Sequence, residues 1–252
     1  MPEEFRTPPE STEMSLTDKF VGILTSPGEV YQSVVTSEPK TSNWMIPMVL
    51  AIIFALVFTF VAFNQPAIQD EMAAGQMKQF EKQIAEGKMT QEQAEQAMSF
   101  SKPGSMMFML FGSIGVIFVV VVALFLYSLV YWLIGKIAFK ATVPYGKVLE
   151  VNGLAMFIAP VTTLVTLVLV VSMGSLYAQP AASLLVGEID PTNSTHKFLM
   201  AVNVFEFWML FVTAVGLSKI WNVTIQKSLG AVGGVWLVWT LLKSFVNLGF
   251  GA

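Results

Sequence analysis

Five stretches of this chain are longer and more apolar than the helices of a water-soluble protein. They cover residues 44–63, 106–134, 154–177, 198–220 and 229–250. Each holds about 20 residues or more, the length that an α-helix needs to cross a hydrocarbon core roughly 30 Å thick. Glu206 and Lys243 are the only charged residues within them, apart from Lys219 at the end of the fourth stretch. The sequence therefore predicts an all-α integral membrane protein with a bundle of five transmembrane helices.

The overall composition supports the membrane class and also excludes several kinds of function. Hydrophobic residues make up 54% of the 252 residues and charged residues 12%, and the charged share is about half that of an ordinary soluble protein. The net charge of −3 gives no reason to expect nucleic acid as a partner. Cysteine is absent and histidine occurs once, so disulfides, thiolate metal sites and most nucleophile–base pairs are excluded. We expect no enzyme, no cofactor and no metal site.

Residues ahead of the first apolar stretch divide into two parts. Residues 1–14 are rich in proline and glutamate, and predict a disordered tail. Residues 15–43 predict two short interfacial helices on the cytoplasmic side, the second beginning with Ser26 as N-cap, Pro27 as first helical residue and Glu29 returning to the cap. Their apolar face could lie on the membrane interface or pack onto the end of the bundle. The remaining residues, 44–252, form the membrane domain.

A polar segment between the first two spans predicts a helical hairpin over residues 66–100. Apolar residues recur at helical spacing over 66–86. They are Ile68, Met72, Phe80 and Ile84. Thr90 and Gln93 then have the spacing of a capping box, which predicts a second helix. The apolar face of this hairpin needs cover from lipid headgroups, from the bundle or from a partner.

The positions of the lysines predict the orientation of the chain. Short lysine-rich loops face the cytoplasm, and the loops after the second and fourth spans have the clearest excess of lysine over acid. The whole connection between the first two spans, residues 64–105, has four lysines but six acidic residues. This distribution predicts a cytoplasmic N-terminus, with the hairpin and the C-terminus on the other side. We expect the chain to lie in a bacterial inner (plasma) membrane.

Polar residues inside or beside the spans are the candidate functional residues. A charge in mid-membrane costs about 2.5–3.5 kcal/mol on insertion scales unless it is paired. Glu206, about eight residues into the fourth predicted span, and Lys243 in the antiparallel fifth span are expected to pair, directly or through Asn203 or Asn247. The pair could serve as a proton or ion relay, or it could fix helix register.

A second polar group stands where the third span begins, and its members are Tyr145, Lys147, Glu150 and Asn152. It predicts a cytoplasmic docking surface or an ion vestibule, against the alternative of ordinary interface anchoring by tyrosine and lysine. Pro160 within the third span removes one backbone hydrogen bond and should kink the helix.

Several short segments together resemble the Yip domain family of Ypt-interacting membrane proteins, in its bacterial form. They are Ser26-Pro27-Gly28-Glu29-Val30-Tyr31 within a cytoplasmic lead-in from Phe20 to Val34, Trp44-Met45-Ile46-Pro47 at the first span, Tyr145-Gly146 with Asn152-Gly153-Leu154-Ala155 and Pro160 at the third, and Asn203-Val204-Phe205-Glu206-Phe207-Trp208 with Gly216-Leu217 at the fourth. Leu154 stands where the family often has tyrosine. The resemblance covers about residues 20–248.

The resemblance implies five spans, a cytoplasmic N-terminus and no catalytic residue. Eukaryotic members of the family assist vesicle traffic and bind lipidated small GTPases. We therefore expect a non-enzymatic multi-pass protein that organises membrane or partner proteins, in a trafficking-like or scaffold role. Its expected partners are membrane lipids, another membrane protein or a second copy of the chain. The alternative is a small transporter or channel that uses Glu206.

Overall fold

The computed structural model describes residues 14–187, 189–190 and 193–245. Within these residues, five helical segments are long and apolar enough to cross a membrane. They are α3 (Ser42–Phe63), α6 (Met106–Ala138), α7 (Tyr145–Ala155) with α8 (Ile158–Met173), α10 (Val204–Trp221) and α11 (Ile225–Phe245). An all-α membrane protein with five candidate spans is thereby confirmed.

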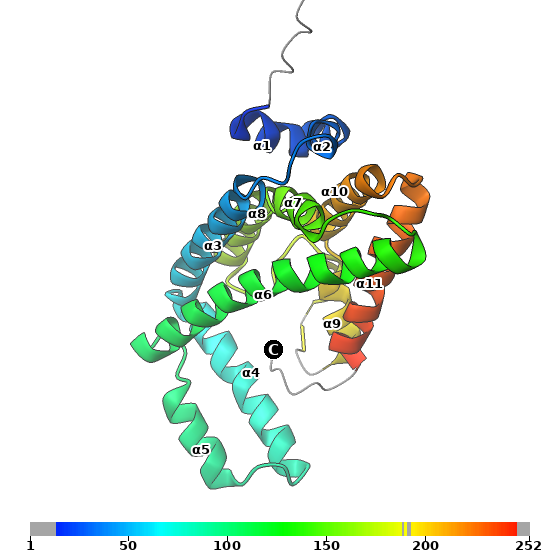
Figure 1. The fold of residues 1–252 in the computed structure, drawn as a ribbon. Helices are drawn as coiled ribbons and strands as arrows, with labels where there is room; N and C mark the ends of the chain where they lie inside the picture. Colours follow the sequence, from blue (N-terminus) through cyan, green and yellow to red (C-terminus); the bar gives the residue numbers. More distant parts are fainter. Residues whose placement is uncertain (1–13, 188, 191–192, 246–252) are drawn as a thin grey trace, which may run out of the picture.

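The remaining helices lie outside the spans. They are α1 (Leu16–Thr25), α2 (Pro27–Val35), α4 (Pro66–Ala85), α5 (Gln91–Phe100), the 3₁₀ turn η1 (Ala182–Leu185) and α9 (Ser194–Ala201). Figure 1 shows α1 and α2 together on one side of the bundle near the start of α3, whereas α4 and α5 extend beyond the end of α3. The predicted tail over residues 1–14 falls, except for Met14, outside the described residues.

The outer surface of the spans is apolar. On α6, the side chains of Met106, Phe118 and Ile137 are 89%, 66% and 75% exposed. This helix holds 33 residues and is therefore about 50 Å long. It runs obliquely across the bundle in Figure 1. Because α6 exceeds the roughly 30 Å of a hydrocarbon core, it must tilt or protrude, and lipid is the solvent that suits its exposed side chains.

The helix pair α1–α2 packs onto the bundle rather than presenting its apolar face to lipid. Ile23, Val30 and Tyr31 are 0% exposed and belong to one core cluster with residues of α7 and α10. The Tyr31 hydroxyl donates a hydrogen bond to the carbonyl of Val151 (3.1 Å). Burial raises the pKa of Tyr31, so this hydroxyl stays protonated and able to donate. Of the two locations predicted for the helix pair, the structure shows packing on the bundle.

Two glycines permit this close packing. A Cβ added to Gly216 would lie 2.5 Å from Cγ1 of Val151 and 2.8 Å from the ring of Tyr31. A Cβ added to Gly153 would overlap the backbone of Trp44. Gly216 therefore lets α2 approach α10, and Gly153 lets α3 approach α7.

The third span is longer than predicted, and it is broken. It begins at Tyr145 rather than at residue 154, and α7 gives way to α8 at Met156 and Phe157. Pro160 explains the break, because its ring clashes with the carbonyl four residues earlier, that of Met156, and offers it no N–H. The backbone N–H of Ala159 donates to the Met156 carbonyl instead (2.9 Å). The proline predicted to kink this span therefore divides it.

The fourth span is shorter than predicted. The predicted stretch began at residue 198, but α10 begins at Val204, and residues Ser194–Ala201 form the separate helix α9. Asn203 separates the two helices in an extended conformation and makes an antiparallel bridge with Ala181. Its side-chain oxygen accepts hydrogen bonds from the backbone N–H groups of Phe205 (2.9 Å) and Glu206 (3.4 Å). Asparagine is a strong N-cap, so it starts a new helix at this point.

Local capping explains where α1 and α5 begin, and the start of α2 differs from the prediction. Ser15 and Asp18 form a capping box that begins α1, and Thr90 and Gln93 form the predicted one that begins α5. Ser26 is the N-cap of α2 with Pro27 after it, but its side chain makes no capping hydrogen bond. The α2 start therefore depends on the proline and on packing of the helix pair, not on the predicted capping box.

Among the described residues, the contacts of the hairpin α4–α5 with the bundle lie at its base. Ile68 packs with Ala62 and Val170 in a small core cluster. The Glu71 carboxylate accepts hydrogen bonds from the Ser175 hydroxyl and the Leu176 backbone N–H, both at 2.6 Å. Farther along the hairpin, Met77 and Phe100 are 51% and 70% exposed. The bundle therefore covers the base of the hairpin and leaves its outer part uncovered.

Replacing Gly216 by alanine should destabilise the fold. The added methyl group has to displace Val151 or Tyr31, and overpacking of this kind costs typically 1–3 kcal/mol. Gly115→Ala on α6 is the matched control, because an added Cβ there meets no atom within 4 Å. Thermal unfolding in detergent would compare the two variants with wild type. Equal unfolding temperatures for both variants would contradict the close packing of α2 on α10.

Candidate functional site

A fully buried carboxylate is the centre of the most elaborate polar network in the described residues. Glu150 lies in α7, whose residues from Lys147 to Ala155 are all buried. The Glu150 side chain is 0% exposed, and that of Lys147 is 7% exposed. Moving a charge out of water costs several kcal/mol, so each of these groups needs close partners.

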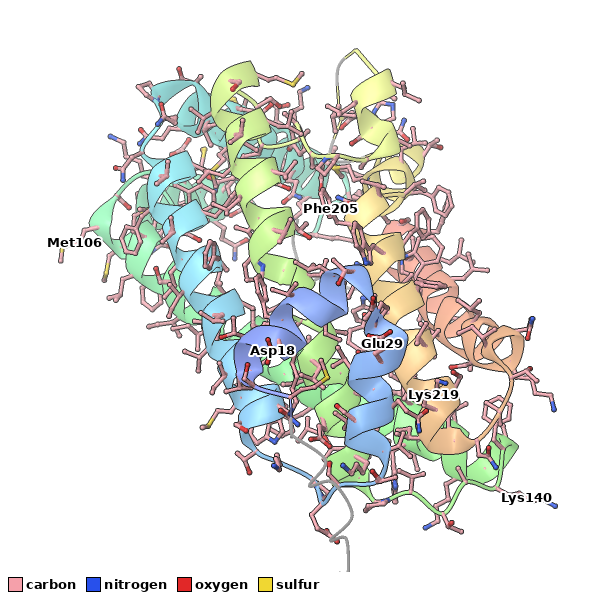
Figure 2. All side chains as sticks on the ribbon, turned by 90° about the horizontal axis from the view of Figure 1, so that it is seen from above. Asp18, Glu29, Met106, Lys140, Phe205 and Lys219 are labelled. Atoms are coloured by element: carbon pink, nitrogen blue, oxygen red, sulfur yellow. The ribbon has the colours of Figure 1, made fainter. Side chains whose placement is uncertain are left out.

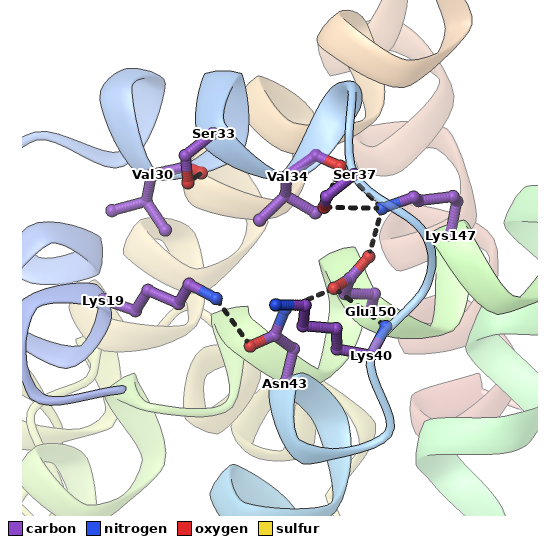
Figure 3. A network of polar contacts seen from close by, with 9 residues as sticks. All are labelled: Lys19, Val30, Ser33, Val34, Ser37, Lys40, Asn43, Lys147 and Glu150. Atoms are coloured by element: carbon purple, nitrogen blue, oxygen red, sulfur yellow. Dashed lines mark hydrogen bonds and ion pairs between the residues drawn. The ribbon is translucent and has the colours of Figure 1, made fainter. Parts of the chain in front are cut away.

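The carboxylate of Glu150 is bound on both oxygens. Oε2 accepts a hydrogen bond from Nζ of Lys147 at 2.8 Å, in an ion pair three residues apart on one helix. Oε1 accepts from Nδ2 of Asn43, which is the second residue of α3, and from the backbone N–H of Lys40 at 3.3 Å. Figure 3 shows these donors converging on Glu150 from α7 and from the start of α3. Donors from α7 and from the start of the first span therefore bind the same carboxylate.

Lys147 extends the network to the helix pair. Its Nζ also donates to the carbonyl of Val34 at 2.6 Å and to the Ser37 hydroxyl at 3.4 Å. Val34 lies in the last turn of α2, where helix carbonyls have no partner within the helix. One ammonium thus neutralises Glu150 and caps α2. The end of α2 is held against α7 by this contact (Figure 3).

Lys19 joins the network from α1. Its Nζ donates to Oδ1 of Asn43 at 3.0 Å, in a buried environment. Asn43 can satisfy both neighbours in only one orientation, with its oxygen toward the ammonium of Lys19 and its amide N–H toward the carboxylate of Glu150. The network Lys19–Asn43–Glu150–Lys147 therefore connects α1, α3, α7 and the end of α2. We call it the Glu150 network.

The cluster predicted as a cytoplasmic surface is mostly interior. Glu150, Lys147 and Asn152 are 0%, 6% and 8% exposed, so a docking surface or vestibule formed by these side chains was a wrong prediction. Nδ2 of Asn152 donates to the Ser128 hydroxyl of α6 at 2.9 Å. The partly buried Tyr145 donates from its hydroxyl to the carbonyl of Phe125, also on α6, at 3.1 Å. All four side chains fasten helices to one another.

Glu206 lies nearer the helix end than predicted. It is in the first turn of α10, not eight residues into a span, and its Oε1 accepts a hydrogen bond from the indole N–H of Trp236 at 3.0 Å. Carboxylates are favoured there, because the helix dipole is positive at its N-terminus. The predicted neighbour Asn203 acts as the N-cap of α10.

Lys243 is not the direct partner that was predicted for Glu206. The two residues lie at the same end of the bundle, and the charge of Lys243 acts on Glu206 through space. Nevertheless, within the described ranges no ion pair within 4.0 Å joins them. The ammonium of exposed Lys243 lies 5.8 Å from the ring centroid of Trp239 instead. Asn247, the other predicted neighbour, falls outside the described residues.

Comparison with known proteins identifies the family. The Yip1 domain model matches residues 21–246, which is most of the chain. The chain belongs to the Yip1 domain family. No match was found among curated proteins or among solved structures.

In this Yip1 domain, the segments that carried the sequence resemblance meet in space. Tyr31 of the lead-in packs on Gly216 of the fourth-span segment and donates to the carbonyl of Val151 beside the third-span segment. Trp44 at the first span lies against Gly153 of the third-span segment. The Glu150 network lies beside these contacts. Sequence reasoning named Lys147 and Glu150 as one polar group, but it missed their ion pair and their partners Lys19 and Asn43.

Removing one member of the buried ion pair should destabilise the Yip1 domain strongly. Lys147→Met or Glu150→Gln leaves the other group without its charged partner, which typically costs 3–5 kcal/mol. The double variant should lose less than the sum of the two single variants, because no unpaired charge remains from this pair. Thermal unfolding in detergent would give the three values.

The matched control is the exposed ion pair of Lys88 and Glu86, whose side chains are 61% and 37% exposed. Lys88→Met should leave the unfolding temperature unchanged, because water already solvates both charges. Losses that simply add in the double variant, or single variants as stable as Lys88→Met, would show that the buried pair does not hold the structure.

Proposed function

We propose that this Yip1-domain protein is a non-enzymatic membrane scaffold that organises lipid and partner proteins. The observation that carries the proposal is the use of its buried charges. Glu150 and Lys147 have their hydrogen-bonding groups directed at protein atoms of α2, α3 and α7, which ties the helices together. These groups therefore serve the architecture, and the surfaces left for function are the exposed ones.

The outer part of the hairpin is the surface that we propose for protein partners. Met77 on α4 and Phe100 on α5 are exposed, and the bundle covers only the base of the hairpin. Exposed large apolar side chains outside the spans are typical of interaction surfaces. The partner would be another membrane protein or a second copy of this chain.

The transporter alternative depended most on the position of Glu206. It required a carboxylate in mid-membrane at the end of a polar path. Glu206 instead lies in the first turn of α10 and is bonded to Trp236.

The orientation that we propose rests on the lysines at one end of the bundle. Lys140 and Lys219 both lie toward the lower end of the bundle in Figure 2. Phe139 and Trp221, their near neighbours in sequence, are in contact, with ring centroids 5.2 Å apart. An excess of lysine favours the cytoplasmic side, and we place the N-terminus there, in a bacterial plasma membrane.

Cysteine labelling would test this orientation, because the chain has no cysteine of its own. Lys140→Cys should react with a membrane-impermeant maleimide only after the cells are opened, and Lys88→Cys, in the hairpin, should react in intact cells. Both positions are exposed in the structure. Labelling of Lys140→Cys in intact cells would reverse the orientation.

Photo-cross-linking would test the scaffold role. A photoreactive amino acid in place of Met77 should form a discrete protein adduct in native membranes, and the mass of the adduct would distinguish a second copy from a different protein. The control position is Phe118, 66% exposed on α6, which should cross-link to lipid. The same pattern at both positions would contradict a partner surface on the hairpin.

Reconstitution would test the alternative directly. Proteoliposomes with the wild-type protein and with Glu206→Gln should show the same proton and sodium flux as empty vesicles. Flux that is present in wild type and lost in Glu206→Gln would overturn the scaffold in favour of a transporter.

A further inference from the structure

A groove at the end of α6 is lined by two lysines that are not part of the Glu150 network. It has a volume of about 470 Å³ and is lined by Trp132, Lys136 and Lys140 together with the segment 141–144. Both lysine side chains are exposed. Among the described residues, none that lines the groove is acidic, so its charge is positive without compensation.

The shape of the groove is fixed by the end of α6. Lys140 has a left-handed backbone conformation (φ 54°), and the N–H of Ala141 donates to the carbonyl of Gly135 at 2.9 Å. This bond spans six residues, one more than the long bond of a Schellman helix end, and together with the left-handed Lys140 it turns the chain out of the helix. The indole N–H of Trp132 donates to the carbonyl of Val143 at 3.0 Å and so closes the groove on one side. The two lysines are thus held beside a rigid wall.

Aromatic residues place the groove at the depth of the lipid headgroups. Trp132 makes an edge contact with Tyr145, with ring centroids 6.4 Å apart, and the Nζ of Lys136 lies 4.9 Å from the Trp132 ring. Tryptophan and tyrosine gather at the boundary between hydrocarbon and water, and lysine extends from there toward the polar side.

The same face of α6 continues as an apolar surface. Leu133 lies three residues before Lys136 and four before Ile137, so these three side chains share one face of α6, and Lys140 lies just past the end of the helix. Leu133 and Ile137 are 40% and 75% exposed. A molecule on this face therefore meets hydrocarbon-like side chains along α6 and two ammonium groups at its end. An apolar surface that ends in two positive charges is complementary to an acyl chain with an anionic headgroup.

We propose that this groove binds an anionic phospholipid, with the headgroup phosphate between Lys136 and Lys140 and an acyl chain along Leu133 and Ile137. Basic grooves between the ends of transmembrane helices are known to take such headgroups. The neighbouring groove lined by Gln32 and Lys219 is a weaker candidate, because it continues past Glu29, whose charge opposes an anion. The proposal stands independently of the scaffold role.

Native mass spectrometry of the full chain in detergent would test the proposal, with dioleoylphosphatidylglycerol and dioleoylphosphatidylcholine as the two probes. Wild type should bind one phosphatidylglycerol more tightly than phosphatidylcholine. In Lys136→Gln/Lys140→Gln this preference should fall by about 30-fold, because each lysine near an anionic headgroup contributes roughly a factor of five. Lys136→Arg/Lys140→Arg should keep it, which separates loss of charge from loss of fold.

The matched control is Lys219→Gln/Lys227→Gln, which removes the same charge from exposed residues at the same end of the bundle. It should keep the preference for phosphatidylglycerol. An equal loss in the two glutamine double variants would show general surface electrostatics and overturn the site. Complete competition by millimolar inorganic phosphate would also overturn it, because the site would then recognise phosphate rather than lipid.

Discussion

The carboxylate of Glu150 has no contact with solvent, and the arrangement of the helices around it follows from that condition. A buried charge is tolerated only while donors surround it. Those donors come from α7 itself, from Asn43 in α3 and from the segment that leads into α3. Lys147 and Asn43 then each bind a second group, in α2 and α1. The position of the helix pair is therefore coupled to the charge state of one residue in a span.

The rest of the molecule faces two different solvents. The spans expose long apolar side chains such as Phe118, which suits hydrocarbon, and the hairpin stands beyond them with Met77 and Phe100 uncovered. The spans would thus contact lipid, and the hairpin would contact protein partners outside the hydrocarbon core. A buried polar network with exposed apolar surfaces fits the scaffold that we propose, and the basic groove at the end of α6 would give it a point of contact with anionic lipid.

Much of this architecture was predictable from the sequence, because long apolar stretches, a proline within a span and capping residues act locally. The five spans, the break near Pro160 and the Thr90 capping box depend on residues close together in the chain. The Glu150 network does not, since Asn43 lies 107 positions from Glu150. A single sequence does not show that two residues so far apart in the chain lie in contact.

The difference between the predicted and the observed position of Glu206 has a similar cause. The apolar stretch runs unbroken from residue 198 into α10, but α9 ends at Ala201 and the side chain of Asn203 begins the new helix α10. A polar side chain that competes for backbone N–H groups can override an apolar pattern. The predicted partner Lys243 was then near enough to act electrostatically but not to form an ion pair, and Trp236 took its place.

Hydrogen–deuterium exchange in lipid nanodiscs would test most directly whether the Glu150 network holds the helix pair on the bundle. The amides of residues 16–35 should be protected in the wild-type protein, because these helices are packed and capped. In Glu150→Gln their exchange should accelerate much more than that of α6 and α11. Unchanged protection of residues 16–35 in Glu150→Gln would contradict the account.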